Sequence, residues 1–197
     1  MKIGLISDIH AHLSDLERAL DILYSHSVEK ILCAGDLVEK GPDGDAVVEL
    51  LNKNLIAAVE GNHDENAVRH GALGFEDGET RLSAESLSFL TALPKTRDYE
   101  WNGKRVLLCH GTPESNKTRV YAEKVPKRMK KYLRQSCYDI FIHGHSHAPM
   151  DVNWKGIRLL NPGSVRGVRA RDSHTCGVLD LSSGVFDVLR LKDGRPY

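Results

Sequence analysis

Ile3-Gly4-Leu5-Ile6-Ser7-Asp8-Ile9-His10 opens the sequence with a short apolar run that ends in a polar cluster. The run predicts a strand over residues 3–6. A helix is expected next, because four leucines recur at helical spacing, with Ser14 and Asp15 as candidate caps near its start (Leu13, Leu16, Leu20 and Leu23). Apolar runs at 31–34 and 55–59 then flank a helical pattern at 46–51. Strand–helix–strand order at this spacing predicts parallel βαβ units in an α/β domain.

The second half of the chain shows the pattern of antiparallel hairpins. Residues 64–93 are expected to be mostly helical, and the pattern changes after Pro94. Three hairpin turns are predicted: Asn102-Gly103 between 98–101 and 104–109, Lys155-Gly156 between 150–154 and 157–160, and Ser183-Gly184 between 175–181 and 185–191. A chain that begins parallel and ends antiparallel predicts a four-layer αββα sandwich of two mixed β-sheets flanked by helices. Because no repeat or linker interrupts it, we expect residues 1–197 to form a single domain.

The composition is that of an ordinary soluble globular protein. Of its 197 residues 41% are hydrophobic and 27% are charged, and the formal net charge is zero, which gives no sign of a nucleic acid or a membrane as partner. The acid at Asp8 comes too early for a signal peptide, so a cytoplasmic location is expected. Cys33 and Cys109 lie inside apolar runs and are interpreted as small core residues.

Five polar clusters, each rich in metal-binding residue types, follow predicted strands. They are Ser7-Asp8-Ile9-His10, Gly35-Asp36, Gly61-Asn62-His63-Asp64, His110-Gly111 and Gly144-His145-Ser146-His147. Ligand sites of α/β sheets form beyond the carboxyl ends of the strands, so the clusters are expected to converge there. Because side chains alternate along a strand, Asp8 and His10 are predicted to point the same way, and so are His145 and His147. One such cluster alone is usually an ordinary turn, but five of complementary type indicate a site.

These residues divide into two sets of metal ligands that share one carboxylate. The first set is Asp8, His10, Asp36 and His147, and the second is Asp36, Asn62, His110 and His145. Mixed imidazole and carboxylate donors favour zinc, manganese, iron, nickel or cobalt over calcium. The sequence therefore predicts two divalent metal ions.

The ordered clusters resemble the signature of the calcineurin-like metallophosphoesterases, which is D-x-H, GD, GNH, H and GHxH. The resemblance spans residues 1 to about 165, and Asn161-Pro162-Gly163-Ser164 is similar to a turn of the small bacterial and archaeal members. It implies a two-sheet sandwich with two metal ions at one end, manganese first among them. One departure is Ala11-His12, where members of the family often have Gly-Asn.

The resemblance extends to residues that act on the substrate. Gly35–Gly41 is similar to the GD-x-VDRG motif of protein Ser/Thr phosphatases and symmetrical dinucleoside tetraphosphate hydrolases. By position, Glu39 orients the catalytic histidine and Lys40 takes the place of a phosphate-binding arginine, without its bidentate geometry. His63 is the candidate acid that protonates the leaving group, because imidazole titrates near neutral pH; bracing of the loop is its alternative role. Asn62, His63 and Lys40 are expected to contact the substrate.

Three functions remain open. The first is a hydrolase of phosphodiester or phosphoanhydride bonds in small nucleotides, favoured by the compact chain. The second is a phosphomonoesterase or protein phosphatase, suggested by Gly35–Gly41. The third is a scaffold on the same fold, like the retromer subunit that resembles this family, although such a scaffold would be expected to lose ligands. The sequence leaves homo-oligomers open.

Other basic and histidine residues have an open or structural interpretation. The basic residues of segment 114–137 either overhang the site and attract a polyanion or form a solvated helix face. His12 is interpreted as a loop or helix-start residue and His143 as packing. No motif surrounds His26, His70 and His174, and they are taken as structural.

Overall fold

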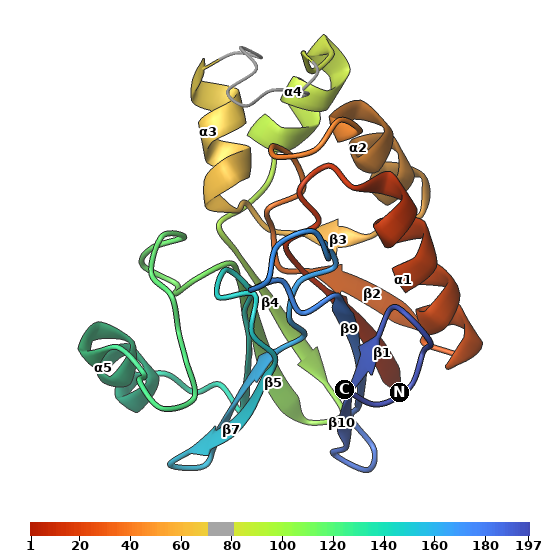
Figure 1. Cartoon of the computed structure of the whole chain (residues 1–197). Coiled ribbons are helices and arrows are strands. Elements are labelled where there is room, and N and C mark those ends of the chain that lie inside the picture. Colours follow the sequence, from red (N-terminus) through yellow and green to blue (C-terminus); the bar gives the residue numbers. More distant parts are fainter. Residues whose placement is uncertain (71–80) are drawn as a thin grey trace.

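The computed structural model describes residues 1–70 and 81–197 and contains two five-stranded mixed sheets packed face to face (Figure 1). The first sheet has the order β10-β9-β1-β2-β3, in which β1, β2 and β3 are parallel and β9 is antiparallel to both its neighbours. Its strands are β1 (Lys2–Ile6), β2 (Lys30–Cys33), β3 (Ala57–Ala58), β9 (Thr175–Asp180) and β10 (Phe186–Arg190).

The second sheet has the order β4-β5-β6-β8-β7, with β5, β6 and β8 parallel in the middle and an antiparallel strand at each edge. Its strands are β4 (Thr96–Trp101), β5 (Lys104–Cys109), β6 (Ile140–Ile142), β7 (Met150–Trp154) and β8 (Ile157–Asn161). The predicted Asn102-Gly103 and Lys155-Gly156 turns join β4 to β5 and β7 to β8, all four turn residues having positive φ. The third predicted turn is longer, because the loop between β9 and β10 runs from 181 to 185.

Three apolar clusters fill the spaces between four layers. Alternate residues of the central strands, such as Leu5, Leu108 and Ile142, meet between the sheets. The outer face of the first sheet is covered by helices whose buried leucines include Leu16 and Leu51. These helices are α1 (Leu13–Ser25), α2 (Gly44–Lys53), α3 (Asn62–His70) and α4 (Ala84–Thr91). A fifth helix, α5 (Lys127–Gln135), packs on the outer face of the second sheet. The predicted αββα sandwich is confirmed.

Two local predictions are wrong. Ser14 and Asp15 do not cap α1; the N–H of Leu13 instead donates to Asp43 Oδ2 at 3.3 Å, and Asp15 pairs with His174. The strand predicted over 55–59 is reduced to Ala57–Ala58, because the N–H of Leu55 donates to Asn52 and completes the end of α2.

Part of the predicted helical region 64–93 lies outside the described residues. The described part holds α3 and α4, and residues 71–80 are the remainder. Within residues 1–70 and 81–197, none of the helices has the length and apolar character needed to cross a membrane.

Candidate metal centre

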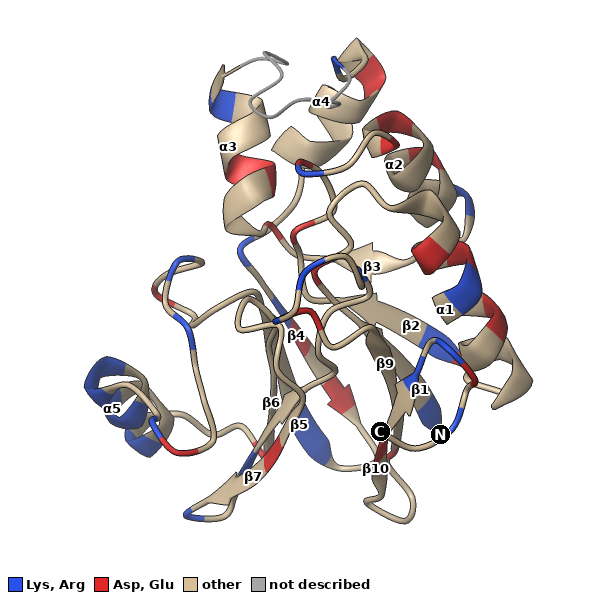
Figure 2. Ribbon diagram, viewed as in Figure 1, with Lys and Arg blue, Asp and Glu red and all other residues tan. Residues whose placement is uncertain are grey.

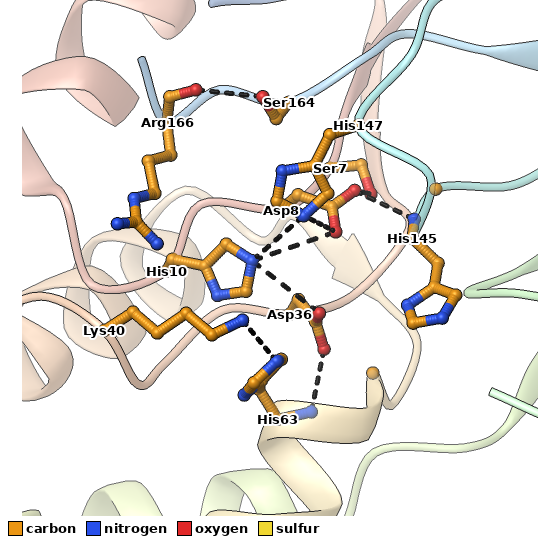
Figure 3. Close-up of polar contacts among 12 residues, drawn as sticks. Ser7, Asp8, His10, Asp36, Lys40, His63, His145, His147, Ser164 and Arg166 are labelled. Atoms are coloured by element: carbon orange, nitrogen blue, oxygen red, sulfur yellow. Dashed lines mark hydrogen bonds and ion pairs between the residues drawn. The ribbon is translucent and has the colours of Figure 1, made fainter. Parts of the chain in front are cut away.

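All five polar clusters meet at one end of the sandwich, beyond the carboxyl ends of β1, β2, β3, β5 and β6. Figure 3 shows side chains from every cluster except His110-Gly111. Three groups of side chains there have ligand atoms within 4.8 Å of one another: Asp8, His10 and His147; Asp36, His110 and His145; and His10, Asp36 and His63. The structure thus brings together the predicted residues from segments far apart in the sequence.

The expected reason for the side-chain directions is wrong, although the directions agree. Asp8 and His10 lie beyond the end of β1, and His145 and His147 lie beyond β6. Each of the four has a φ between 52° and 65°, which is left-handed rather than extended backbone. Tight loops therefore aim these side chains, and strand alternation does not.

The first ligand set is compact enough for a metal ion. His10 Nε2 and His147 Nε2 are 3.3 Å apart, and Asp8 Oδ1 lies 3.2 Å from His147 Nε2. Metal–nitrogen bonds of about 2.1 Å at tetrahedral or octahedral angles place two ligand atoms about 3.0–3.4 Å apart. Both distances to His147 Nε2 fit that geometry, whereas Asp8 Oδ1 and His10 Nε2 lie 4.0 Å apart and would have to approach each other, or lie at a wider angle, around an ion.

The second set shares Asp36 with the first. His110 Nε2 lies 3.2 Å from His145 Nδ1 and 3.2 Å from Asp36 Oδ2. The same Asp36 Oδ2 lies 3.8 Å from His10 Nε2 of the first set. One carboxylate oxygen of Asp36 is therefore near the imidazole nitrogens of both sets.

The atoms that would not bind metal are already held by hydrogen bonds. Asp8 Oδ2 accepts from Ser7 Oγ at 2.6 Å and from the His145 N–H at 3.0 Å, which leaves Oδ1 toward the histidines. Asp36 Oδ1 accepts from the His63 N–H at 2.9 Å. His110 Nδ1 lies 2.6 Å from the carbonyl oxygen of Ala34, so it donates there and Nε2 is the nitrogen that could bind a metal ion.

The donor set also contains an oxygen that needs a partner. Asn62 Oδ1 is buried and has no hydrogen-bond partner within residues 1–70 and 81–197. A buried amide oxygen without a partner costs free energy, and a bound cation would remove that cost. The residues present therefore fit two divalent ions.

The protonation states of the ligands suit a metal. Burial would raise the pKa of Asp8, but the hydrogen bond from His147 and the charges of His110 and His147 lower it to about 2. Burial lowers the pKa of His145 to about 4, so this imidazole is neutral at neutral pH. Burial also acts to lower the pKa of His110, but the Asp36 carboxylate raises it to about 9, so a metal ion binding there would displace a proton.

Glu39 and Lys40 both contact His63. Glu39 Oε2 meets His63 Nδ1, and Lys40 Nζ meets His63 Nε2. The other Glu39 oxygen, Oε1, accepts from Asn66 Nδ2 at 2.6 Å and so fixes the carboxylate. Burial lowers the pKa of Lys40, and Arg169, Arg166 and Arg171 lower it further by repulsion.

Asp64 holds the loops together, a role that the sequence pattern did not indicate. Its carboxylate accepts from four backbone N–H groups: Asp36 at 2.9 Å, Leu37 at 2.8 Å, Val38 at 3.2 Å and Gly61 at 2.8 Å. Only its place in the Gly61–Asp64 cluster signals it. Asp172 and Arg166, which also lie at the site, have no motif around them.

The basic residues of segment 114–137 divide between the site and α5. Arg119 is close enough to repel a charged His145, and Lys117 lines a hollow together with Asn62 and His63. The side chain of Arg166 is directed toward His10 and Lys40 (Figure 3). The basic residues of α5, in contrast, lie on the outer side of the second sheet (Figure 2), where Met129 and Leu133 pack the helix against Phe141 and Leu159. The α5 segment is a solvated helix face.

The remaining histidines fall into structural positions. His12 is the N-cap residue of α1 without a side-chain cap bond, and His26 is its C-cap residue. His143 is fully buried with Nδ1 3.3 Å from Asn161 Nδ2. His70 contacts the Asn66 carbonyl oxygen, and His174 pairs with Asp15.

Known proteins match this chain over most of its length. Residues 1–184 match the model of the calcineurin-like phosphoesterase superfamily domain. Phosphodiesterase MJ0936 of Methanocaldococcus jannaschii is 26% identical over 91% of this chain and 93% of its own length. Phosphodiesterase YfcE of Escherichia coli is 27% identical over 98% and 94%. The crystal structure of a metallophosphoesterase from Sphaerobacter thermophilus, 23% identical, covers 95% of this chain and 86% of its own, with a TM-score of 0.78.

Proposed function

Because the chain belongs to the calcineurin-like phosphoesterase superfamily, we propose that it hydrolyses phosphodiester or phosphoanhydride bonds of small nucleotide-type substrates with two divalent metal ions. The observation that carries this proposal is Asp36, whose Oδ2 is 3.8 Å from His10 Nε2 and 3.2 Å from His110 Nε2. A carboxylate placed in this way can bind two ions at once. The names of the two phosphodiesterase relatives support the reaction class.

Each ion would be held by the ligand set derived above. Asp8, His10, Asp36 and His147 would hold one, and Asp36, Asn62, His110 and His145 the other. When bound, two divalent ions offset the charge of the phosphoryl group and lower the pKa of water. Manganese is our first choice, and iron, zinc, nickel and cobalt suit the same donors.

His63 is proposed to protonate the leaving oxygen. Glu39 accepts from Nδ1 of this imidazole, so Nε2 is the atom that exchanges a proton with the substrate. A nitrogen of His63 also lies within 4.8 Å of ligand atoms of His10 and Asp36, which places it beside the ions. Lys40 contacts Nε2 and is proposed, together with Asn62, to bind the phosphoryl group.

The cations around Lys40 favour substrates with more than one negative charge. Arg166, Arg169 and Arg171 are close enough to lower its pKa. Their combined positive field attracts a phosphoanhydride such as a dinucleoside polyphosphate more strongly than a monoanionic diester. We therefore place dinucleoside polyphosphates first among the small nucleotides.

The proposal is tested with purified protein that is stripped of metal and reloaded with each candidate ion. Metal content is measured, and hydrolysis is followed with p-nitrophenyl phosphate, bis-p-nitrophenyl phosphate and diadenosine tetraphosphate. We expect two ions per chain, loss of hydrolysis in EDTA, and return of hydrolysis with manganese. The diester or the tetraphosphate should be cleaved with a higher kcat/KM than the monoester.

Other outcomes separate the alternative functions. Preference for the monoester would favour a phosphomonoesterase, for which the contact between Glu39 and His63 is the supporting observation. Two bound ions without hydrolysis of any substrate would favour a binding scaffold. Hydrolysis that survives prolonged EDTA treatment would overturn the metal-dependent mechanism.

A further inference from the structure

Asp172 contacts the metal centre from outside every sequence motif. Its Oδ1 lies 2.7 Å from Nδ1 of His147, and its side chain is fully buried. The opposite ring nitrogen, His147 Nε2, is the atom 3.2 Å from Asp8 Oδ1. The imidazole therefore stands between a buried carboxylate and the first ligand set.

The loop between β8 and β9 fixes this carboxylate. The N–H groups of Val165 and Arg166 donate to the carbonyl oxygens of Ser7 at 2.9 Å and Asp8 at 3.2 Å, which attaches the loop to the first cluster. Asp172 Oδ2 accepts from the N–H of Arg169 at 2.8 Å, and the N–H of Asp172 donates back to the Arg169 carbonyl at 2.8 Å. Oδ2 also lies 3.5 Å from Nε of Arg166. One carboxylate thus connects His147, the turn and the arginine beside the site.

We propose that Asp172 is a positioning residue for one of the two metal ions. A neutral imidazole carries a single ring proton, and the carboxylate keeps that proton on Nδ1. The lone pair is then on Nε2, which faces Asp8 and the ion. The inference rests on the proposed function, because it needs a metal ion in the first ligand set.

The effect is specific to the first set. In the second set His110 Nδ1 is paired with the Ala34 carbonyl, and His145 directs its Nδ1 toward His110 Nε2. A carboxylate partner also makes an imidazole a stronger ligand than a carbonyl partner does. Loss of Asp172 should therefore weaken the binding of one ion and leave the binding of the other unchanged.

The test is a manganese titration of the metal-free protein, with free manganese measured by electron paramagnetic resonance. Wild type should bind two ions. Asp172→Asn and Asp172→Ala should bind one ion as wild type does and the other about 10–100-fold more weakly, the usual effect of removing such a partner. Titrations that superimpose on that of wild type would overturn the proposal.

A matched control and a double variant separate positioning from support of the loop. Asp15→Asn removes the carboxylate charge from another Asp–His pair at the same loop, between Asp15 Oδ1 and His174 Nε2 at 3.1 Å, and should leave the affinity for both ions unchanged. In a His147→Ala background, Asp172→Asn should change metal affinity by less than about twofold, because its route to the ion is gone. An undiminished effect in that background would show that Asp172 acts through the loop alone.

A measurement on the wild-type protein tests the same inference without any substitution at Asp172. Long-range ¹H–¹⁵N spectra of the zinc-loaded protein, assigned by loss of the His147 signal in His147→Gln, should show the proton on Nδ1 and coordination through Nε2. The reverse assignment would refute the inference. These experiments use no substrate, so failure to find a substrate leaves them intact, whereas absence of metal from wild type would refute the proposed function itself.

Discussion

Gly61→Ala tests how closely the loops of the metal centre approach one another. A Cβ at Gly61 would lie 2.1 Å from Asp36 Oδ1 and 2.2 Å from Asp36 N, where real Cβ contacts under 3.0 Å essentially never occur. The two loops would have to separate by about 1 Å, and the atoms displaced are the backbone and the carboxylate of Asp36, the residue shared by both ligand sets. A displacement of about 1 Å at a catalytic group can lower turnover by about 10²-fold, or about 2.7 kcal/mol in the barrier.

The assay is kcat for the best substrate at saturating manganese, together with the free energy of unfolding from urea denaturation. Gly156→Ala is the matched control, because Gly156 also resists substitution through its φ of 89° but has no atom within 4 Å of an added Cβ. Alanine there should cost about 1–2 kcal/mol of stability through left-handed strain and leave kcat unchanged. If Gly61→Ala kept more than about a tenth of wild-type turnover, the argument from close approach would be wrong.

Three further changes probe the ligands and the buried histidine. Asp36→Asn should lower turnover more than tenfold, a barrier change above ~1.4 kcal/mol, while its circular dichroism stays native; Asp187→Asn, at an exposed position of β10, is the control. His63→Ala should lower kcat about 10²–10⁴-fold on poor leaving groups and much less on nitrophenolate, and an equal loss on both would favour loop bracing. In metal-free protein, burial lowers the pKa of His143 to about 4, so the unfolded chain takes up a proton before the folded one does. His143 alone should therefore lower the free energy of unfolding by about 1.5 kcal/mol between pH 6.5 and pH 5, and His143→Gln should remove this contribution.

The layers of the fold could be predicted because short-range patterns decide them. Asn102-Gly103 and Lys155-Gly156 adopt the positive φ values that a two-residue hairpin needs, and the leucines of α1 face the first sheet as their spacing indicates. The cap of α1 could not be predicted, because Asp43 reaches it from a distant loop. Such a contact depends on how two elements pack, which local sequence does not encode.

The site was predictable to the level of which side chains converge. The ordered clusters place Asp36 between two histidine sets, and the structure brings these groups together. The residues that contact and orient the metal ligands were not predictable in the same way. Asp172 follows three separated arginines without any metal-binding pattern, and its contact with His147 exists only because the loop after β8 folds back over Ser7 and Asp8.

The ligand side chains point toward one another, as expected, but left-handed loop backbone directs them and strand alternation does not. Asp8, His10, Asp36, His145 and His147 have φ values between 52° and 65°. At about 1–2 kcal/mol each, this strain amounts to about 5–10 kcal/mol, which is comparable to the whole stability of a typical domain.

Backbone hydrogen bonds between the first two loops help to hold this conformation. The N–H groups of Asp8, His10 and Ala11 donate to the carbonyl oxygens of Gly35, Asp36 and Leu37, at 3.0, 3.0 and 2.8 Å. Ala11 itself has a φ of 57°, at the position where similar sequences often carry glycine, and its buried methyl group contributes about 0.8 kcal/mol against the strain. The two ligand loops are therefore held to each other by backbone hydrogen bonds, which fix the left-handed residues that direct Asp8, His10 and Asp36 toward one another.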